Sequence, residues 1–396
     1  MKKISVIGQG YVGLPLALAA CSCGYSVVGI DNNLNRIKDL ASGRSGLEDV
    51  PDLALQAELD SGRFKLSSNY EEVMHSNVFL ICVPTPLAKN NLPDLMAVES
   101  AAKNISMYLK KGSLVVLEST VSPGTTRNYL VPILEQGSGL SVNDFNVAFS
   151  PERIDPRNKE WSLVNTPKIV AGFTEKSKAM AIEFYSKFIT NVISVESLEV
   201  AETAKLLENS FRLVNISFIN ELSIFCNKLG IDINKVIEAA TTKPYGFMPF
   251  YPSIGVGGHC IPVDPIYLST KAKEIGSPTE FIDLASRVNH EMPRYFGRRA
   301  EEILGNLKKK RVLVVGVSYK PNVADVRETP VKDLIKELVD RGAIVSWHDE
   351  LVNKWEGSES VALSSDYDLA ILATPHDGVD LSKLGNIPIL NTRSSI

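Results

Sequence analysis

A glycine-rich turn near the start of the chain constrains the fold more than any other sequence feature. Residues 4–7 are a short apolar run typical of a buried strand, and a G-x-G-x-x-G motif follows it, formed by Gly8, Gly10 and Gly13. A helical segment begins after the motif, and the next apolar run, residues 27–30, ends at Asp31. In this setting the glycines let a pyrophosphate approach the backbone at the positive end of the helix, and the acid accepts hydrogen bonds from a ribose. The pattern predicts a dinucleotide-binding domain.

The residues after this turn also bear on the choice of dinucleotide. A carboxylate at Asp31 repels a 2′-phosphate, so NAD is favoured over NADP. Arg36 follows about one helical turn later and keeps NADP open as an alternative. We therefore expect NAD as the cofactor.

Three further apolar runs, residues 78–83, 114–117 and 147–149, are each followed by a polar cluster. Parallel strands buried on both faces produce such runs, and ligands bind at the carboxyl ends of these strands. Thr85 and Thr120 would then lie near a nicotinamide and its substrate, although either could equally be an ordinary helix cap. Glu152 follows the third run, where a carboxylate can act as a base.

A long amphipathic helix is predicted in the middle of the chain. Apolar residues recur in steps of three and four between residues 200 and 229. About 30 residues at 1.5 Å each span about 45 Å, which is longer than one domain needs, so the helix should bridge two halves of the protein. Its remaining apolar surface suggests a homodimer contact. Lys205 and Asn209 share one face, and such a lysine is either a surface residue or a stabiliser of a developing oxyanion.

A second βαβ array occupies the end of the chain. It begins after the charge run 308–311, and its strands are predicted near residues 312–316, 343–347, 369–374 and 388–393. The phosphate-binding glycines are missing from it. The expected fold is therefore α/β, with two Rossmann-like doubly wound parallel-sheet domains joined by a long central helix. The expected domains are an NAD-binding domain at 1–195, a central helical domain at 196–307 and a second nucleotide-type domain at 308–396, unless the last array is only scaffold.

A cysteine loop lies between these halves. Glycines at 255, 257 and 258 precede Cys260, and prolines at 262 and 265 follow it. Such glycines allow a ligand to approach the backbone closely, so the loop is typical of one that carries a nucleophilic cysteine. The alternative is a buried structural cysteine. Asp264 lies four residues beyond the thiol. His259 is adjacent to it, but neighbouring side chains on an extended loop point apart, so we do not assign a Cys–His pair.

Composition excludes several other classes of function. The net charge is −4 and charged residues make up 22% of the 396 residues, which gives no electrostatic footprint for nucleic acid. No apolar run approaches 18 residues, so no membrane partner is expected. The five cysteines form no Cys-x-x-Cys pair, which argues against a metal site and for a reducing cytoplasm.

Taken in order, the motifs of this chain resemble those of the UDP-glucose/GDP-mannose dehydrogenase family, and the resemblance covers essentially all 396 residues. The motifs are GQGYVGLP at 8–15, PTP at 84–86, ESTVSPGT at 118–125, SPER at 150–153, AETAKLLEN at 201–209, GGHCIPVDP at 257–265 and NTR at 391–393. Residues 150–156 and 243–252 look like those of the branch that oxidises UDP-N-acetylglucosamine for surface polysaccharides. UDP-N-acetylgalactosamine, UDP-N-acetylmannosamine and UDP-glucose stay open.

The resemblance implies an oxidation of the sugar's C6 by two NAD⁺ in turn, through a thiohemiacetal and a thioester on Cys260. It implies catalytic roles for Cys260, Lys205, Asn209, Asp264, Glu152 and Thr120. It implies cofactor contacts at Gly8, Gly10, Tyr11, Val12, Gly13, Asp31, Arg36, Pro84, Thr85, Thr120 and Arg327. It implies UDP-sugar contacts at Glu152, Arg153, Lys205, Asn209, Phe250, Tyr251, Ser253, Gly257, Lys320 and Arg393. Asp264 would support Cys260 or the lysine, and Glu152, Thr120 and a water would transfer protons.

Two positions depart from the family pattern. Val263 stands where some relatives have a lysine near the cofactor phosphates, and Pro156 stands where UDP-glucose enzymes often have a second glutamate. The second departure argues mildly against UDP-glucose and leaves the hydrolytic base open. The competing hypotheses are a two-electron dehydrogenase of the 3-hydroxyacid type and a nucleotide-sugar sensor without turnover.

Overall fold

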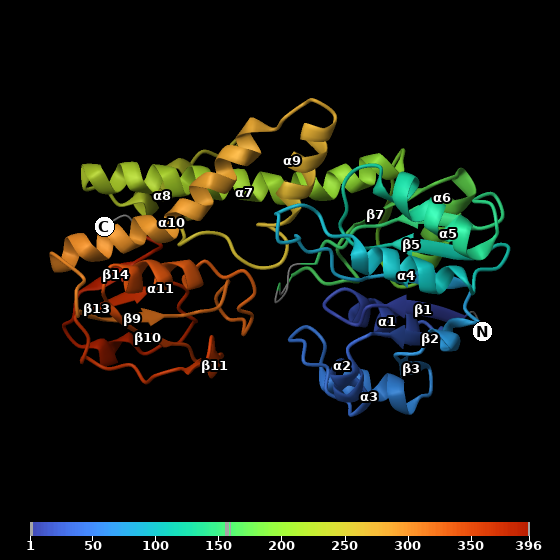
Figure 1. The fold of residues 1–396 in the computed structure, drawn as a ribbon, viewed down its shortest axis with the longest axis horizontal. Helices are drawn as coiled ribbons and strands as arrows, with labels where there is room; N and C mark the ends of the chain where they lie inside the picture. Colours follow the sequence, from blue (N-terminus) through green and yellow to red (C-terminus); the bar gives the residue numbers. More distant parts are fainter. Residues whose placement is uncertain (1–2, 155–157, 159, 395–396) are drawn as a thin grey trace. The chain divides into compact units, whose positions relative to one another are not determined.

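The computed structural model describes residues 3–154, 158 and 160–394 of the chain (Figure 1). Pro156, one of the two departures above, lies outside the described residues. The chain forms two compact units, Met1–Leu207 and Glu208–Ile396, and each is described by itself.

An eight-stranded sheet forms the centre of the first unit. Its strands lie in the order β3 (Phe64–Ser67), β2 (Ser26–Ile30), β1 (Lys3–Ile7), β4 (Val78–Ile81), β5 (Leu114–Leu117), β6 (Asn146–Phe149), β7 (Lys168–Gly172) and β8 (Val192–Ser194). The five apolar runs predicted in this region form β1, β2, β4, β5 and β6, and their neighbours pair in parallel. Strand β7, which the sequence analysis did not predict, returns antiparallel to β6.

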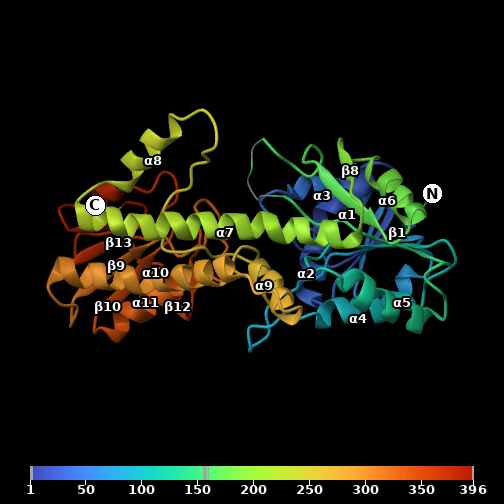
Figure 2. The ribbon, with the colours of Figure 1, turned by 90° about the horizontal axis from the view of Figure 1, so that it is seen from above.

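Helices cover both faces of this sheet (Figure 2). On one face lie α1 (Gly13–Ser22), α2 (Leu34–Ala41), α3 (Asp52–Asp60) and α6 (Glu175–Tyr185), and on the other lie α4 (Met96–Ser106) and α5 (Val131–Ser138). The central strands are mostly apolar because both faces of the sheet are buried, as in other doubly wound sheets. The π-helical segment η2 (Thr126–Leu130) leads into α5, and the 3-10 segment η1 (Tyr70–Val73) precedes β4.

Helix α7 (Leu198–Leu229) is one continuous helix of 32 residues, as the apolar periodicity predicts. Its first turns belong to the first unit, where the buried Glu202 carboxylate accepts from the backbone N–H groups of Gly124 (2.6 Å) and Thr126 (2.8 Å). Burial raises the pKa of this carboxyl to about 6 in spite of these two hydrogen bonds. The helix is therefore anchored to the turn that follows β5.

A four-stranded parallel sheet forms the centre of the second unit. Its order is β10 (Ile344–His348), β9 (Arg311–Val315), β13 (Leu369–Leu372) and β14 (Ile389–Asn391), and the short strands β11 (Lys354–Trp355) and β12 (Ser358–Glu359) pair beside it as a hairpin. Helices α10 (Glu280–Leu304) and α11 (Val331–Asp340) pack on one face, while the 3-10 segment η3 (Leu381–Leu384) and loops cover the other. Helices α8 (Ile233–Thr241) and α9 (Asp264–Glu274) complete the unit (Figure 1).

The two sheets begin with the same backbone arrangement. Gly8 has φ +93° and donates to the carbonyl of Ile30 (2.8 Å); Gly316 has φ +84° and donates to the carbonyl of His348 (2.8 Å). At both places an L side chain would be strained, so glycine is required. The second array is therefore a Rossmann-like unit even though it lacks the G-x-G-x-x-G motif.

None of the helices in the described part of the chain is long and apolar enough to cross a membrane.

Candidate active site

The three glycines of the first turn have different structural roles. A Cβ on Gly8 would lie 2.5 Å from the carbonyl oxygen of Cys82, and a Cβ on Gly13 would lie 1.8 Å from that of Gly8, so both are required by backbone packing. A Cβ on Gly10 would have no described atom within 4 Å. Val12 is the N-cap of α1 and makes no side-chain cap, and the described first turn contains no acidic residue. The open space at Gly10 and the uncapped helix end fit a pyrophosphate.

Asp31 is held at the carboxyl end of β2. Its two carboxylate oxygens accept from the backbone N–H groups of Gln9 and Asn33, each at 2.9 Å, and the side chain is half-buried. A carboxylate has about four acceptor sites, so this one can still accept from ribose hydroxyls. Tyr11 lies exposed in the turn. These features fit NAD, which would be held by the turn, Asp31 and the end of α1.

Arg36 on α2 points back toward the same turn. Its Nε donates to the carbonyl of Gln9 (2.8 Å), and Nη1 donates to the carbonyl of Ser45. Burial lowers the pKa of this guanidinium, with Asp31 acting in the opposite direction. The side chain therefore holds the glycine turn in place, and a direct contact with the cofactor stays a prediction.

The ends of β4 and β5 carry the next group of candidates. Pro84 is exposed, Thr85 is buried and Thr120 is half-buried. The hydroxyl of Ser119 donates to the carbonyl of Val83 (2.7 Å), which ties the two strand ends together. The neighbouring thiol of Cys82 is buried, and burial together with Glu118 raises its pKa well above the usual range.

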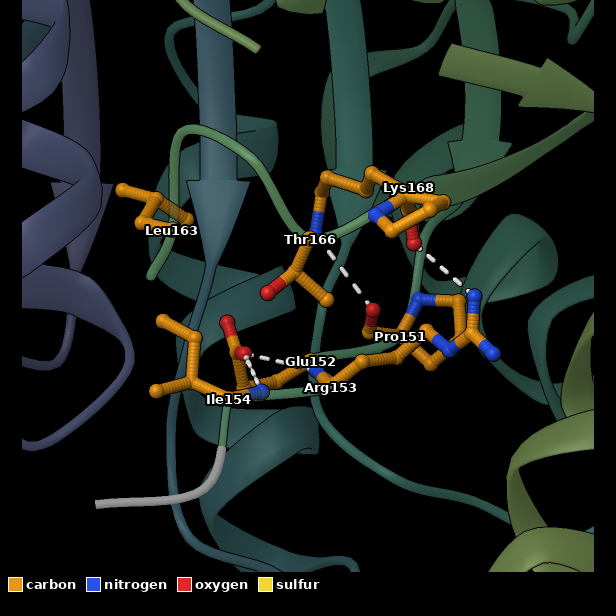
Figure 3. Close-up of a pocket in the computed structure, with 8 residues that line it drawn as sticks. Pro151, Glu152, Arg153, Ile154, Leu163, Thr166 and Lys168 are labelled. Carbon is orange, nitrogen blue, oxygen red and sulfur yellow. Dashed lines mark hydrogen bonds between the residues drawn. The ribbon is translucent and has the colours of Figure 1, made fainter. Parts of the chain in front are cut away.

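Glu152 lies directly after β6, beside a small pocket (Figure 3). One carboxylate oxygen, Oε1, accepts from the backbone N–H groups of Arg153 (2.6 Å) and Ile154. The other oxygen, Oε2, is buried and has no hydrogen-bond partner among the described residues. Arg153 turns away and donates from Nη1 to the carbonyl of Pro167 (2.8 Å). Glu152 is thus fixed by its own loop, with one oxygen available to a ligand or water.

A buried charged cluster behind this loop was not found by sequence reasoning. Lys168 Nζ lies 2.7 Å from Glu118 Oε2, and the hydroxyl of Tyr185 donates to Oε1 of the same carboxylate. All three side chains are buried. Burial raises the pKa of Glu118, while the contacts with Lys168 and Tyr185 oppose that rise. Lys168 opens an apolar strand, a position where a lysine is normally solvated, so the sequence gives no signal of its burial.

In the second unit the glycines of the cysteine loop pack against another loop. A Cβ on Gly257 would lie 2.6 Å from the carbonyl oxygen of Glu328, and a Cβ on Gly258 would lie 2.8 Å from the ring of Tyr319. The N–H of Gly258 donates to the carbonyl of Arg327 (3.1 Å). These two glycines therefore serve loop–loop packing, and the predicted contact of Gly257 with the UDP-sugar stays a prediction.

Cys260 is exposed at the start of α9. Its carbonyl accepts from the N–H of Asp264 (2.8 Å), and the Asp264 carboxylate accepts from Asn209 Nδ2 (2.5 Å). Asn209 and Asp264 are both buried, and so is Lys205, one turn earlier on α7. The predicted support of Cys260 or Lys205 by Asp264 stays a prediction. His259 is half-buried, and burial followed by the charge of Arg327 lowers its pKa.

Two buried asparagines hold the segment before Cys260. Asn220 Oδ1 accepts from the N–H of Ser253 (2.8 Å), and Asn289 Oδ1 accepts from the N–H of Val256 (2.6 Å). Sequence reasoning missed Asn289, although a polar residue in the apolar seam of α10 was a usable signal. Among the predicted sugar contacts, the Phe250 ring lies 5.7 Å from that of Phe211, and Tyr251 is exposed.

The predicted cationic contacts of the second unit follow its strand ends. Lys320 comes after β9 and Arg393 comes after β14, at the carboxyl ends of parallel strands where open α/β sheets bind ligands. Arg327 pairs with Asp325 at 2.6 Å, in the segment that packs on Gly258.

The acid after β10 is used differently from Asp31. Asp349 is buried, and it accepts from the N–H of Val317 (2.8 Å) and from Nε2 of His376 (2.8 Å). The other ring nitrogen of His376 accepts from the N–H of Asn322 (2.8 Å). Burial opposes ionisation, yet these hydrogen bonds lower the pKa of Asp349 to about 2. These contacts commit the Asp349 carboxylate to the fold of the second unit.

Comparison with known proteins identifies the family. The chain matches three domains of the UDP-glucose/GDP-mannose dehydrogenase family: the NAD binding domain over residues 2–189, the central domain over 199–291 and the UDP binding domain over 313–389. The chain belongs to the UDP-glucose/GDP-mannose dehydrogenase family. It is an NAD-dependent nucleotide-sugar dehydrogenase, and so an oxidoreductase.

Similar proteins span nearly the whole dehydrogenase. It is 37% identical to a UDP-N-acetyl-D-glucosamine 6-dehydrogenase of Pseudomonas aeruginosa, over 95% of this chain and 88% of that protein. It is 38% identical to a UDP-N-acetyl-D-glucosamine 6-dehydrogenase of Salmonella typhi, over 94% and 90%. A solved structure of a UDP-D-ManNAc dehydrogenase from Pyrococcus horikoshii has a TM-score of 0.91 at 32% identity, covering 100% of this chain and 96% of that one. Among the described residues no cluster of His, Cys, Asp or Glu could hold a metal ion.

Proposed function

We propose that this dehydrogenase oxidises C6 of a UDP-N-acetylhexosamine to the carboxylate in two steps, with UDP-N-acetylglucosamine as its preferred substrate. Two relatives at 37% and 38% identity carry the name UDP-N-acetyl-D-glucosamine 6-dehydrogenase, which supports this sugar. The UDP-D-ManNAc dehydrogenase structure keeps the mannosamine epimer as the main alternative. UDP-N-acetylgalactosamine and UDP-glucose are the further alternatives.

One observation carries the proposal: the loop with the exposed thiol packs on the segment that carries Lys320, a predicted UDP contact. Gly258 lies against Tyr319, the neighbour of Lys320, and donates to the carbonyl of Arg327, so the thiol and the Lys320 ammonium belong to one unit. A cation suits a diphosphate, and a thiol suits an aldehyde. A nucleotide held by this unit would therefore have its sugar within reach of Cys260.

The proposed chemistry assigns the following roles to the chain. Bound NAD⁺ would supply the hydride acceptor for both oxidations, and in the first of them the C6 hydroxyl would also lose its proton. After the first, the Cys260 thiolate adds to the aldehyde carbon and the oxygen takes a proton, which gives a thiohemiacetal; loss of the second hydride and of the hydroxyl proton gives a thioester. Water then attacks the thioester carbon, and the Cys260 thiolate leaves. Lys205 and Asn209 would stabilise the oxygen that becomes negative, Asp264 would fix Asn209, and Glu152 with Thr120 would transfer protons.

The decisive experiment measures NADH formed per UDP-sugar consumed, over a panel of UDP-sugars, for the parent enzyme and for Cys260→Ser. We expect two NADH per sugar and the highest kcat/KM for UDP-N-acetylglucosamine. Cys260→Ser should lose the overall reaction, with kcat down by roughly 1,000-fold or more, while it still binds the UDP-sugar. Cys23→Ser is the matched control, because Cys23 is also exposed and lies in the first unit. One NADH per sugar, or full turnover in Cys260→Ser, would refute the proposal.

We also propose that the dehydrogenase is a cytoplasmic homodimer whose product serves surface polysaccharide synthesis. A nucleophilic thiol requires a reducing compartment, which supports the cytoplasm. An exposed apolar stripe on α7, which includes Leu207 (62% exposed), Phe218 (60%) and Phe225 (57%), supports a dimer through this helix. The relative named Protein CapL, from Staphylococcus aureus, is in keeping with a polysaccharide pathway.

A further inference from the structure

The loop that carries Glu152 is supported by a group outside the roles assigned so far. Nζ of Lys168 lies 3.5 Å from the carbonyl oxygen of Ser150 and 3.4 Å from that of Pro151. Figure 3 shows Lys168 beside Pro151, the residue that precedes Glu152. The ammonium therefore donates to the two residues that immediately precede Glu152.

The amine of Lys168 is paired with Glu118 in the interior of the first unit. The Nζ to Oε2 distance is 2.7 Å, and the two side chains are 5% and 0% exposed. A charge-assisted hydrogen bond of this kind fixes the position of the donor group. Tyr185 contacts both members of this ion pair. Its hydroxyl donates to the other oxygen of Glu118, and its ring centroid lies 5.0 Å from Lys168 Nζ.

The backbone turn at residues 150–154 determines where the Glu152 carboxylate points. Oε1 accepts from the N–H groups of Arg153 and Ile154, so its position follows the backbone of residues 150–154. Oε2 is left facing the small pocket, where the hydroxyl of Thr166 is another buried atom with no partner among the described residues. A shift of the turn would rotate Oε2 away from that pocket.

We propose that Lys168, held in place by its ion pair with Glu118, is a positioning residue that sets the orientation of the Glu152 carboxylate for proton transfer. The inference rests on the proposed function only for the role of Glu152. A buried ion pair is a weak source of stability compared with an apolar replacement, so its presence beside this loop is better explained by a specific geometry than by stability.

The test uses the full chain and the double variant Lys168→Met/Glu118→Gln, which removes both charges and avoids leaving an unpaired buried carboxylate. Hydrogen exchange of the Arg153 and Ile154 amides should become roughly tenfold faster or more, since the carbonyls before them lose their donor. The kcat should fall roughly 10- to 100-fold, with the Kd for NAD⁺ unchanged within about twofold. The single variant Lys168→Arg, which keeps the positive charge and the hydrogen-bond donors, should have a kcat close to that of the parent enzyme. Lys176→Met, an exposed change on α6, is the control.

Each outcome decides the proposal. Faster exchange at Arg153 and Ile154 together with a lower kcat and a displaced acid limb of the kcat pH profile supports it. Unchanged exchange overturns it, and so does a loss of NAD⁺ affinity parallel to the loss of kcat, because the cluster would then support the whole domain. The proposed function fails separately, through one NADH per sugar or an active Cys260→Ser.

Discussion

At the scale of single residues, Gly13 and Gly10 of the same motif have different structural roles. The carbonyl of Gly8 occupies the space where a Cβ of Gly13 would lie, whereas the space around Gly10 is open. The two glycines belong to one sequence motif, but their surroundings in the structure differ. The motif therefore combines a packing requirement with a binding requirement.

We predict opposite effects for two alanine substitutions in this motif. Gly13→Ala should destabilise the first unit by about 3 kcal/mol, because its Cβ overlaps the carbonyl oxygen of Gly8. Gly10→Ala should leave the unfolding free energy unchanged within about 1 kcal/mol and should weaken NAD⁺ binding at least about tenfold, since its Cβ takes up space next to the pyrophosphate. Urea denaturation measures the unfolding free energy of each variant, and a titration with NAD⁺ measures its affinity for the cofactor. An equal loss of stability in the two variants would contradict this.

The candidate site could be predicted from sequence in part, and the reasons are local. Glu152 was found because an apolar run precedes it and a strand end is a defined place. Lys168 was missed because β7 returns antiparallel from beyond residue 160, and nothing in its own segment reveals what covers it. Glycine permits any close approach, so the sequence could not predict that Glu328 and Tyr319 pack against Gly257 and Gly258; the ligand contact of Gly257 stays a prediction.

At the scale of elements, the acids after β2 and β10 show how one arrangement serves two purposes. Asp31 is half-buried and accepts from two backbone N–H groups. Asp349 is buried and accepts from backbone N–H groups and His376, so its charge is compensated within the protein. His376 also accepts from the N–H of Asn322, two residues after Lys320. The Asp349–His376 pair thus stabilises the loop that carries a predicted UDP contact.

Asp349→Asn should therefore reduce the stability of the second unit in a pH-dependent way. The folded pKa of about 2 lies below the usual 3.8, so ionised Asp349 contributes stability above pH 3.8 and loses it as pH falls toward 2. At neutral pH the loss should be about 2 kcal/mol. Denaturation of the parent and the variant between pH 2 and 7 should show a difference that shrinks at the acid end. Asp366→Asn, at an exposed position, is the control, and a difference independent of pH would contradict this account.

The length of α7 could be predicted, but the exposure of its faces could not. Apolar residues in steps of three and four predicted the helix to within two residues of its start. Its buried apolar positions are Leu198, Ala201, Leu206, Leu213, Ile219 and Cys226, whereas six positions of the predicted stripe are exposed: Val200, Leu207, Phe211, Phe218, Phe225 and Leu229. Both faces are apolar, so periodicity alone cannot say which one the chain itself covers.

At the scale of the whole molecule, this exposed stripe leads to a prediction about assembly. Phe218→Glu should convert the proposed dimer to a monomer, because it places a charge at the centre of the stripe. Light scattering after size exclusion should show the molar mass halved, with the circular dichroism spectrum unchanged. Lys228→Glu, at an exposed polar position of the same helix, should leave the mass as it is. A parent enzyme that is already monomeric would rule out the proposed interface.

The contact of Gly257 and Gly258 with the loop at 319–328 has a consequence for selectivity. The exposed thiol of Cys260 and the predicted UDP contact Lys320 lie in the same unit, Glu208–Ile396. Under the proposed roles, the span from the diphosphate to the terminal carbon of the sugar is set within this unit and does not depend on the C2 substituent. We therefore expect substitutions at other residues, with Cys260 unchanged, to alter the preference between glucosamine and mannosamine.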